Sequence, residues 1–282
     1  MTIWEADLYR RPLLSENKEP LWELLVCDIS FQFTYAATVP QSQVNSQWLA
    51  QHLQTALQKA IQQPTQLRVF RPQSLSLLST AAESLRIPVA PWRHTATLKQ
   101  WLVQRARWYP SQPNYSGEGY EPLLLEQPAP NPVPEELWGE QWRFGSLSAQ
   151  DFQTSLIHEP IPIQSVPEDW LPLQIGIASN TLIPGVIVDA GRRTMALAEW
   201  LRAQQPATLT YMAGPPDGVI LEAGLVDRWV LVTFEDEQVR SAARTFVVRQ
   251  QEAQGLHFLL LRPDDSGMTF TGLWLLRSPP IS

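Results

Sequence analysis

A single cysteine and the lack of long apolar runs exclude several classes of protein. Cys27 alone builds neither a disulfide framework nor a cysteine-based metal site, and we expect it to be a small buried residue in a strand. No apolar run approaches the roughly 20 residues that a helix needs to span a bilayer. Residues 1–7 show neither a signal-peptide pattern nor an Arg- and Ser-rich transit peptide. These absences favour a cytoplasmic protein without a membrane span.

Recognisable catalytic and metal-binding patterns are also missing. No serine stands in a Gly-x-Ser-x-Gly elbow. Asp217 and Glu222 loosely resemble the Asp…Glu-x-Lys pattern of metal-dependent nucleases, but Gly224 stands where the lysine would be. The four histidines share no short metal-ligand spacing: His52, His94, His158 and His257. We therefore predict no catalytic residues, no metal and no cofactor.

Charged residues are scarce, at 17% of the chain, and unevenly distributed. The formal net charge of −7 argues against a generic nucleic-acid coat protein, whose affinity would depend on an excess of Lys and Arg. Residues 58–109, however, hold eight basic residues and one acid, a net charge of +7. Residues 110–140 hold six acids and no Lys or Arg. A basic block is therefore followed directly by an acidic one.

The acidic block coincides with a cluster of prolines, which lack an amide donor and interrupt helices. Seven of the 25 prolines fall within 25 residues: Pro110, Pro113, Pro122, Pro128, Pro130, Pro132 and Pro134. We predict an extended, acidic connector at residues 110–137. It would join an N-terminal domain at residues 1–109 to a C-terminal domain at residues 138–282. A content of 44% hydrophobic residues, with 12 tryptophans, suits two packed cores.

Hydrophobic periodicity predicts an α/β (α+β) fold with a mixed sheet in each domain. In the first domain, residues 8–14 and 21–28 flank a turn-rich segment and read as a hairpin. A third strand follows, and then helices alternate with short strands. We expect Asn45 and Ser74 to cap the first two helices.

The C-terminal domain is predicted to have a similar order of elements. Residues 218–225 and 228–234 read as a hairpin, and Asp236 is expected to cap a long helix before the last two strands. Each half contains a strand that ends in Arg-Pro, at Arg71 and at Arg262. This is a weak indication of duplication, and a chance match explains it equally well.

The basic block is the strongest candidate for a binding site. Proteins hold single-stranded RNA with cations on its phosphates and with aromatic or guanidinium groups stacked on its bases. We predict that these residues bind RNA: Arg68, Phe70, Arg71, Trp92, Arg93, Lys99 and Arg107. Arg105 falls on the apolar face of its helix, so we expect its guanidinium to pair with an acid. The alternative for the whole block is that the acidic connector covers it.

A second candidate is the segment from Asp189 to Arg193, which follows a strand and opens a helix. Helix N-termini attract phosphate, and Arg192 and Arg193 would add positive charge there. The segment has one glycine where a dinucleotide fingerprint needs three. We therefore predict RNA-backbone contact by Arg192 and Arg193, with solvated or acid-paired arginines as the alternative.

Several motifs in order along the chain resemble the Tab-two-like family. At the N-terminal end they are Leu8-Tyr-Arg-Arg-Pro-Leu-Leu14 and Leu21-Trp-Glu-Leu-Leu-Val-Cys-Asp28, followed by Val69-Phe-Arg-Pro-Gln73. At the C-terminal end they are Gly255-Leu-His-Phe-Leu-Leu-Leu-Arg-Pro-Asp-Asp265 and Gly272-Leu-Trp-Leu-Leu-Arg277. The resemblance covers nearly the whole chain.

The resemblance implies a non-catalytic RNA-binding factor that promotes translation of photosystem mRNA, mainly that of photosystem I. It implies single-stranded mRNA leaders and other translation or assembly proteins as partners. It also implies an oxygenic phototroph, so a cyanobacterial cytoplasm or, in plant and algal relatives, the chloroplast stroma. Two alternatives remain open: a protein-assembly scaffold without direct RNA binding and, less favoured, a divergent metal-dependent nuclease.

Overall fold

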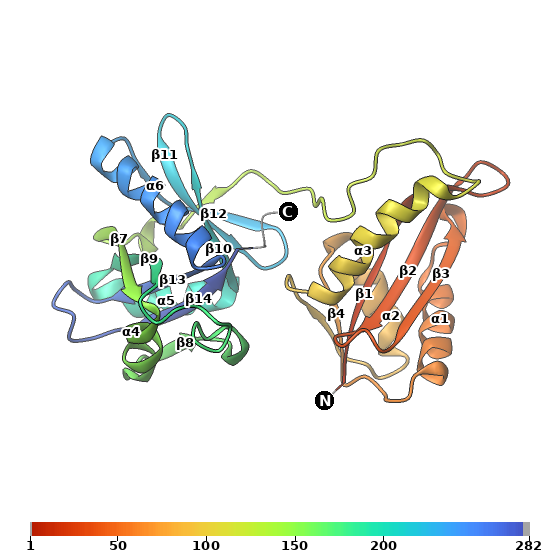
Figure 1. Cartoon of the computed structure of the whole chain (residues 1–282), viewed down its shortest axis with the longest axis horizontal. Coiled ribbons are helices and arrows are strands. Elements are labelled where there is room, and N and C mark those ends of the chain that lie inside the picture. The colour runs from red at the N-terminus through yellow and green to blue at the C-terminus, as the bar shows by residue number, and fades with distance from the viewer. Residues whose placement is uncertain (1, 279–282) are drawn as a thin grey trace. The chain divides into compact units, whose positions relative to one another are not determined.

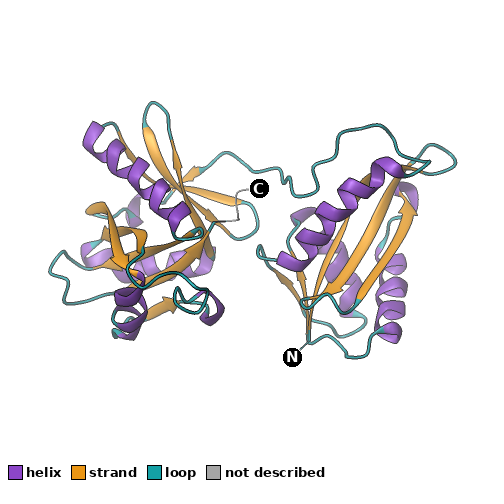
Figure 2. Ribbon diagram, viewed as in Figure 1, coloured by secondary structure: helices purple, strands orange, loops and turns teal. Residues whose placement is uncertain are grey.

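The structure, a computed structural model, describes residues 2–278 and divides into two compact units, Met1–Glu126 and Gln127–Ser282 (Figure 1). Both units contain helices and strands, and parallel and antiparallel strands share sheets (Figure 2). The predicted α/β fold with mixed sheets is thus confirmed. The division falls inside the proline-rich segment, because residues 110–126 pack with the first unit.

Unit 1 is built on a five-stranded sheet in the order β3-β2-β1-β4-β5. The expected N-terminal hairpin is confirmed as the antiparallel pair β1 and β2, to which β3 adds. The next two strands, β4 and β5, run parallel to β1, so their carboxyl ends share one edge. The bounds are β1 Ile3–Leu14, β2 Pro20–Asp28, β3 Thr34–Pro40, β4 Gln66–Val69 and β5 Val89–Pro91.

Three helices cover the two faces of this sheet: α1 (Ser46–Lys59), α2 (Pro72–Glu83) and α3 (Ala96–Trp108). Asn45 caps α1 as predicted, with its side chain accepting from the Trp48 amide at 2.8 Å. The prediction for Ser74 was wrong. Arg71 is the N-cap of α2, and Pro72 is tolerated at the first helical position because that amide needs no intrahelical partner.

The two faces of the unit 1 sheet differ in polarity. Trp4, Ala6 and Leu8 point into an apolar core shared with α1 and α2. Since strand side chains alternate, the residues between them point to the α3 face. There a small apolar cluster that includes Leu25 and Leu98 lies beside buried charged groups on β1.

Unit 2 holds two sheets, in the orders β10-β11-β12-β6 and β7-β9-β13-β14-β8. Its helices are α4 (Ala149–Thr154), α5 (Thr194–Gln204) and α6 (Glu237–Glu252), and Asp236 caps α6 as predicted. The strands of the first sheet are β6 Asn131–Pro132, β10 Pro206–Met212, β11 Asp217–Ala223 and β12 Asp227–Phe234. Those of the second are β7 Gln141–Ser148, β8 Ile163–Ser165, β9 Leu182–Asp189, β13 Leu256–Arg262 and β14 Gly272–Arg277.

The two Arg-Pro arginines occupy the same local setting. Arg71 follows β4 and binds Asp7 on the parallel neighbour β1, with 2.8 Å between Nε and Oδ1. Arg262 ends β13 and binds Asp189 on the parallel neighbour β9, also at 2.8 Å. The sheets around the two pairs differ in strand order, so the units share an ion-pair motif and not one topology.

His257 joins the two sheets of unit 2 from a fully buried position. Its Nε2 accepts the Leu209 amide of β10 at 2.8 Å, which places the ring proton on Nδ1, where the Gly255 carbonyl accepts it. Burial lowers the pKa of His257 to about 4, against the weaker opposing effect of the Gly255 carbonyl.

This pKa makes the stability of unit 2 sensitive to acid. The unfolded chain takes up the proton near pH 6.5 and the folded one near 4, so stability falls as pH drops through that window. We expect a loss of about 2 kcal/mol between pH 7 and 5 from this residue. Urea unfolding of His257→Gln should show a flatter pH dependence than wild type, with His158→Gln as the control. An unchanged slope in His257→Gln would contradict this assignment.

Candidate nucleic-acid interface

Five of the predicted RNA-binding residues converge at the carboxyl ends of β4 and β5 and the start of α3. The Arg68 guanidinium lies over the Trp92 ring, 4.3 Å from its centroid. Trp92 follows β5, and its amide donates to the Val69 carbonyl at the end of β4 at 2.9 Å. The Trp92 side chain is 40% exposed. In open α/β sheets, the carboxyl ends of parallel strands are where ligands bind.

Lys99 joins this group from the first turn of α3. Its Nζ lies 5.2 Å from the centre of the Phe70 ring and donates to the Arg93 carbonyl at 2.7 Å. Burial, and next the charge of Arg93, lower the pKa of Lys99 to about 8, although Glu5 opposes the shift. Most of the Lys99 population therefore remains charged at neutral pH.

The start of α3 already has an anion of its own. The Glu5 carboxylate reaches from β1 and accepts the Leu98 amide at 2.8 Å, in place of a capping side chain at Thr95. Burial raises the pKa of Glu5, although the Leu98 amide, Arg68 and Lys99 partly offset it. Attraction of an external phosphate thus depends on the side-chain cations and not on the helix terminus.

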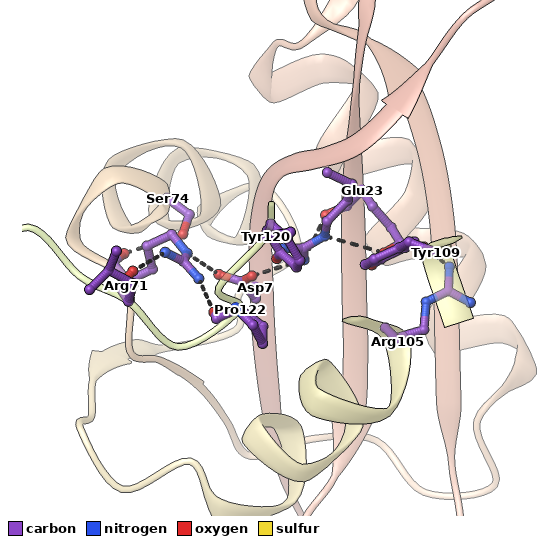
Figure 3. A network of polar contacts seen from close by, with 10 residues as sticks. Asp7, Glu23, Arg71, Ser74, Arg105, Tyr109, Tyr120 and Pro122 are labelled. Carbon is purple, nitrogen blue, oxygen red and sulfur yellow. Dashed lines mark hydrogen bonds and ion pairs between the residues drawn. The ribbon is translucent and has the colours of Figure 1, made fainter. Parts of the chain in front are cut away.

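Arg71 lies in a different setting, because it is 1% exposed and belongs to a buried network (Figure 3). Asp7 accepts Arg71 on Oδ1 at 2.8 Å and Arg11 on Oδ2 at 2.9 Å. Arg11 also binds Glu23, at 3.3 Å. Asp7 and the other charges hold the pKa of Arg11 above its ordinary value, although burial opposes this.

Glu23 extends this network to α3. Its carboxylate accepts Arg105 and the Tyr109 hydroxyl, which confirms that Arg105 pairs with an acid (Figure 3). Burial raises the pKa of Tyr109, so its hydroxyl remains a donor. The network holds two carboxylates and three guanidinium groups, and it depends on further acceptors for its surplus positive charge.

The first part of the connector supplies those acceptors. Arg71 donates to the carbonyls of Pro122 and Leu124, at 2.9 and 3.4 Å, and Arg11 donates to the Tyr120 hydroxyl at 2.6 Å (Figure 3). Among the acidic connector side chains, Glu118 pairs with Arg10, which lies outside the basic block. The connector therefore meets the block through main-chain oxygens on Arg71 and through Leu125 and Tyr120, which pack against the cluster around Phe70 and against Tyr109.

The remaining predicted residues lie apart from the converging group. Arg107 is exposed near the far end of α3, 11 residues and about 16 Å of helix from Ala96. Arg192 and Arg193 are exposed in unit 2, at the short helical turn before α5. The Glu140 carboxylate lies close against Gly191 at that turn, so an acid already neighbours this second candidate.

The buried network itself was not foreseen. Glu5, Asp7 and Arg11 alternate with apolar residues along β1, a pattern typical of a strand with one solvated face. α3 covers that face, so the charged residues become partners of one another. The signal available in the sequence was the row of charged residues on β1 together with the apolar residues of α3, which indicate that the helix packs on that face of the strand.

Asp217, one of the two residues that loosely resembled a nuclease pattern, is held by neighbouring groups of unit 2. The Asp217 carboxylate accepts the Arg240 guanidinium, the Tyr211 hydroxyl and the Gly214 amide. The hydrogen bond from Arg240 and that from Gly214 lower the pKa of Asp217. Residues 2–278 contain no group of three His, Cys, Asp or Glu side chains placed to hold a metal ion. Within the same residues, every helix is too short or too polar to cross a membrane.

Fold and surface together define a two-unit α/β protein that presents cations and aromatic rings at one edge of the unit 1 sheet. Comparison with known families identifies the family to which the chain belongs. The model of the RNA-binding protein Tab2/Atab2 N-terminal region matches residues 3–105, and that of its C-terminal domain matches residues 120–277. The chain belongs to the Tab2/Atab2 family of RNA-binding proteins, as the sequence motifs indicated.

Curated relatives match along nearly the full chain. The chloroplastic Protein TAB2 homolog of Arabidopsis thaliana is 31% identical, over 98% of this chain and 75% of the relative. The homolog of Zea mays is 27% identical, over 98% and 72%. Among solved structures, the HTLV-2 integrase catalytic core aligns with 40% of this chain and 74% of that one, at 12% identity and a TM-score of 0.29. A TM-score this low establishes neither a common fold nor common chemistry.

The buried network gives a test of stability. Asp7→Asn keeps the side-chain shape but leaves the buried Arg11 and Arg71 and the partly exposed Arg105 with one carboxylate. We expect a loss of about 3–5 kcal/mol, as for other buried ion pairs with one partner removed, measured by urea unfolding. Glu118→Gln breaks an exposed pair and should cost about 0–1 kcal/mol. Equal effects of the two substitutions would show that the network does not stabilise unit 1.

Proposed function

We propose that this protein is a non-catalytic factor that binds single-stranded RNA and promotes translation of photosystem mRNA, mainly that of photosystem I. Membership of the Tab2/Atab2 family supports the RNA and photosystem parts of this proposal. The chloroplastic relatives support action in a stroma or in the equivalent cyanobacterial cytoplasm. Other translation or assembly proteins are its expected partners.

The arrangement of Arg68 and Trp92 carries the proposal. The exposed indole offers a flat face for a base, and Arg68 is stacked on it, which presents a cation to the phosphate beside that base. Arg93 and Lys99 extend the same surface. Phe70, predicted to contact RNA, is instead 1% exposed and packs beneath Lys99. Arg107, Arg192 and Arg193 are proposed as phosphate contacts outside this surface. The buried Arg71 is proposed to hold in place the strand end that carries the surface.

Fluorescence anisotropy with a labelled photosystem I mRNA leader tests this function. We expect binding that weakens with salt, and a loss of about 5- to 100-fold in Trp92→Ala through removal of one stacking partner. Arg68→Ala should lower the slope of log affinity against log salt by about 0.7 if it contacts one phosphate.

Trp108→Ala is the matched control. Trp108 is similarly exposed, at 42%, and has an arginine over its ring, but it lies at the other end of α3. It should leave the affinity for the leader within about twofold. No binding of the leader at low salt, where phosphate contacts are strongest, would contradict the proposal and favour a protein-assembly scaffold.

A further inference from the structure

Unit 2 contains a cavity of about 320 Å³ that the RNA-binding surface of unit 1 does not use. It lies between the end of the proline-rich segment and strands β9 and β12. Trp138 and Trp142 line it together with Val188, Leu197 and Val232. This volume is at the lower end of the roughly 300–1,000 Å³ of small-molecule sites, so it suits a single ring system.

Two indole rings in fixed positions form part of its wall. Trp138 is 50% exposed, and its indole N–H donates to the Val133 carbonyl at 2.7 Å, which sets the orientation of the ring. Trp142 packs against Phe144 and Phe234, with ring centres 5.4 Å away in both cases. The wall is therefore ordered before a ligand enters, which lowers the entropy lost on binding.

The lining contains no charged side chain, so a neutral group fits it better than a phosphate. Hydrogen-bonding groups are present at the rim, where Gln141 and Thr233 are exposed. The short strand β6 pairs with β12 only at Trp229 and Val230. In the described part of the chain, Leu231–Thr233 have no strand on that side and leave main-chain groups next to the cavity.

Two exposed arginines lie close in sequence to residues that line the cavity. Arg192 and Arg193 lie between Val188 and Leu197, and Arg193 precedes Leu197 by one helical turn, about 6 Å between Cβ atoms. Their acidic neighbours are Glu140, against Gly191, and Asp189, which is held by Arg262. A neutral aromatic pocket whose lining residues lie within a few positions of two exposed arginines in the chain suits a nucleotide, with its base in the pocket and its phosphate outside.

We propose that this cavity takes one unstacked nucleobase of single-stranded RNA, between Trp138 and the apolar wall. The inference rests on the proposed RNA-binding function and adds a second contact region, in unit 2. A planar, neutral heterocycle fills the aromatic space, and its edge reaches the amide, hydroxyl and main-chain groups of the rim. If an extended peptide occupied this strand edge instead, nucleoside monophosphates would leave the indole signal of Trp138 unshifted and Trp138→Leu would leave leader binding unchanged.

Substitutions at Trp138 provide the test, because its exposed position lets the fold tolerate change. Trp138→Leu should weaken binding of the photosystem I mRNA leader by about 5- to 100-fold, whereas Trp138→Phe keeps a flat ring and most of the affinity. A purely structural role for Trp138 would be met equally well by Leu. Leu182→Ala, at a similarly exposed apolar residue of unit 2, is the control and should have no effect.

A second measurement keeps the base pocket distinguishable from RNA binding as a whole. Each of the four nucleoside monophosphates is added to wild type, and the indole N–H signal of Trp138 is followed by NMR. We expect a saturable shift with at least one nucleotide and none with ribose 5-phosphate. Leader binding that is unchanged in Trp138→Leu but lost in Trp92→Ala overturns the base pocket and leaves the proposed function intact. Failure of wild type to bind the leader refutes the proposed function, and a missing indole shift then overturns the pocket as well.

Discussion

The ion pair of Asp7 with Arg71 is the interaction on which unit 1 depends. It joins β1 to the second residue after β4, and Arg11 and Glu23 extend the network to β2 and to α3. Charges buried this deeply are stable only when every partner is present, so the sheet, the helix and the connector must all be in place together. The carbonyls of Pro122 and Leu124 complete the set and bind residues 110–126 to the unit.

Because Arg71 is bound within this pair, it is not available to a ligand, and other cations of the segment must make the contact. Arg71 is committed to Asp7 and to the connector, while Arg68, three residues earlier, stacks on an exposed indole. The same short segment thus provides an internal anchor and a surface contact. Unit 2 repeats the ion-pair motif with Asp189 and Arg262, and there the exposed Arg192 and Arg193 follow three and four residues after the paired aspartate. In each unit the buried pair fixes the edge on which the proposed contact surface stands.

Local sequence signals predicted much of the fold, and long-range pairing explains what they missed. Hairpin residues, the Asn45 and Asp236 caps and the pairing of Arg105 followed from periodicity and capping chemistry. Convergence of Arg68, Phe70 and Trp92 was foreseeable because short parallel strands end beside each other. Asp7 and Arg71 are 64 residues apart, and only the position of α3 turns the polar side of β1 inward. Strands β7 and β10 were missed, although residues 141–144 and 207–211 do alternate polar and apolar side chains.

Mapping the sites of photochemical crosslinking between the protein and bound RNA tests the central claim most directly. The photosystem I mRNA leader is irradiated with wild-type protein, and the crosslinked peptides are identified by mass spectrometry. We expect crosslinks within residues 68–99, above all at Trp92, where an exposed ring lies beside Arg68. Efficient crosslinking with no product in that segment would show that the RNA binds elsewhere and would contradict the proposed binding surface.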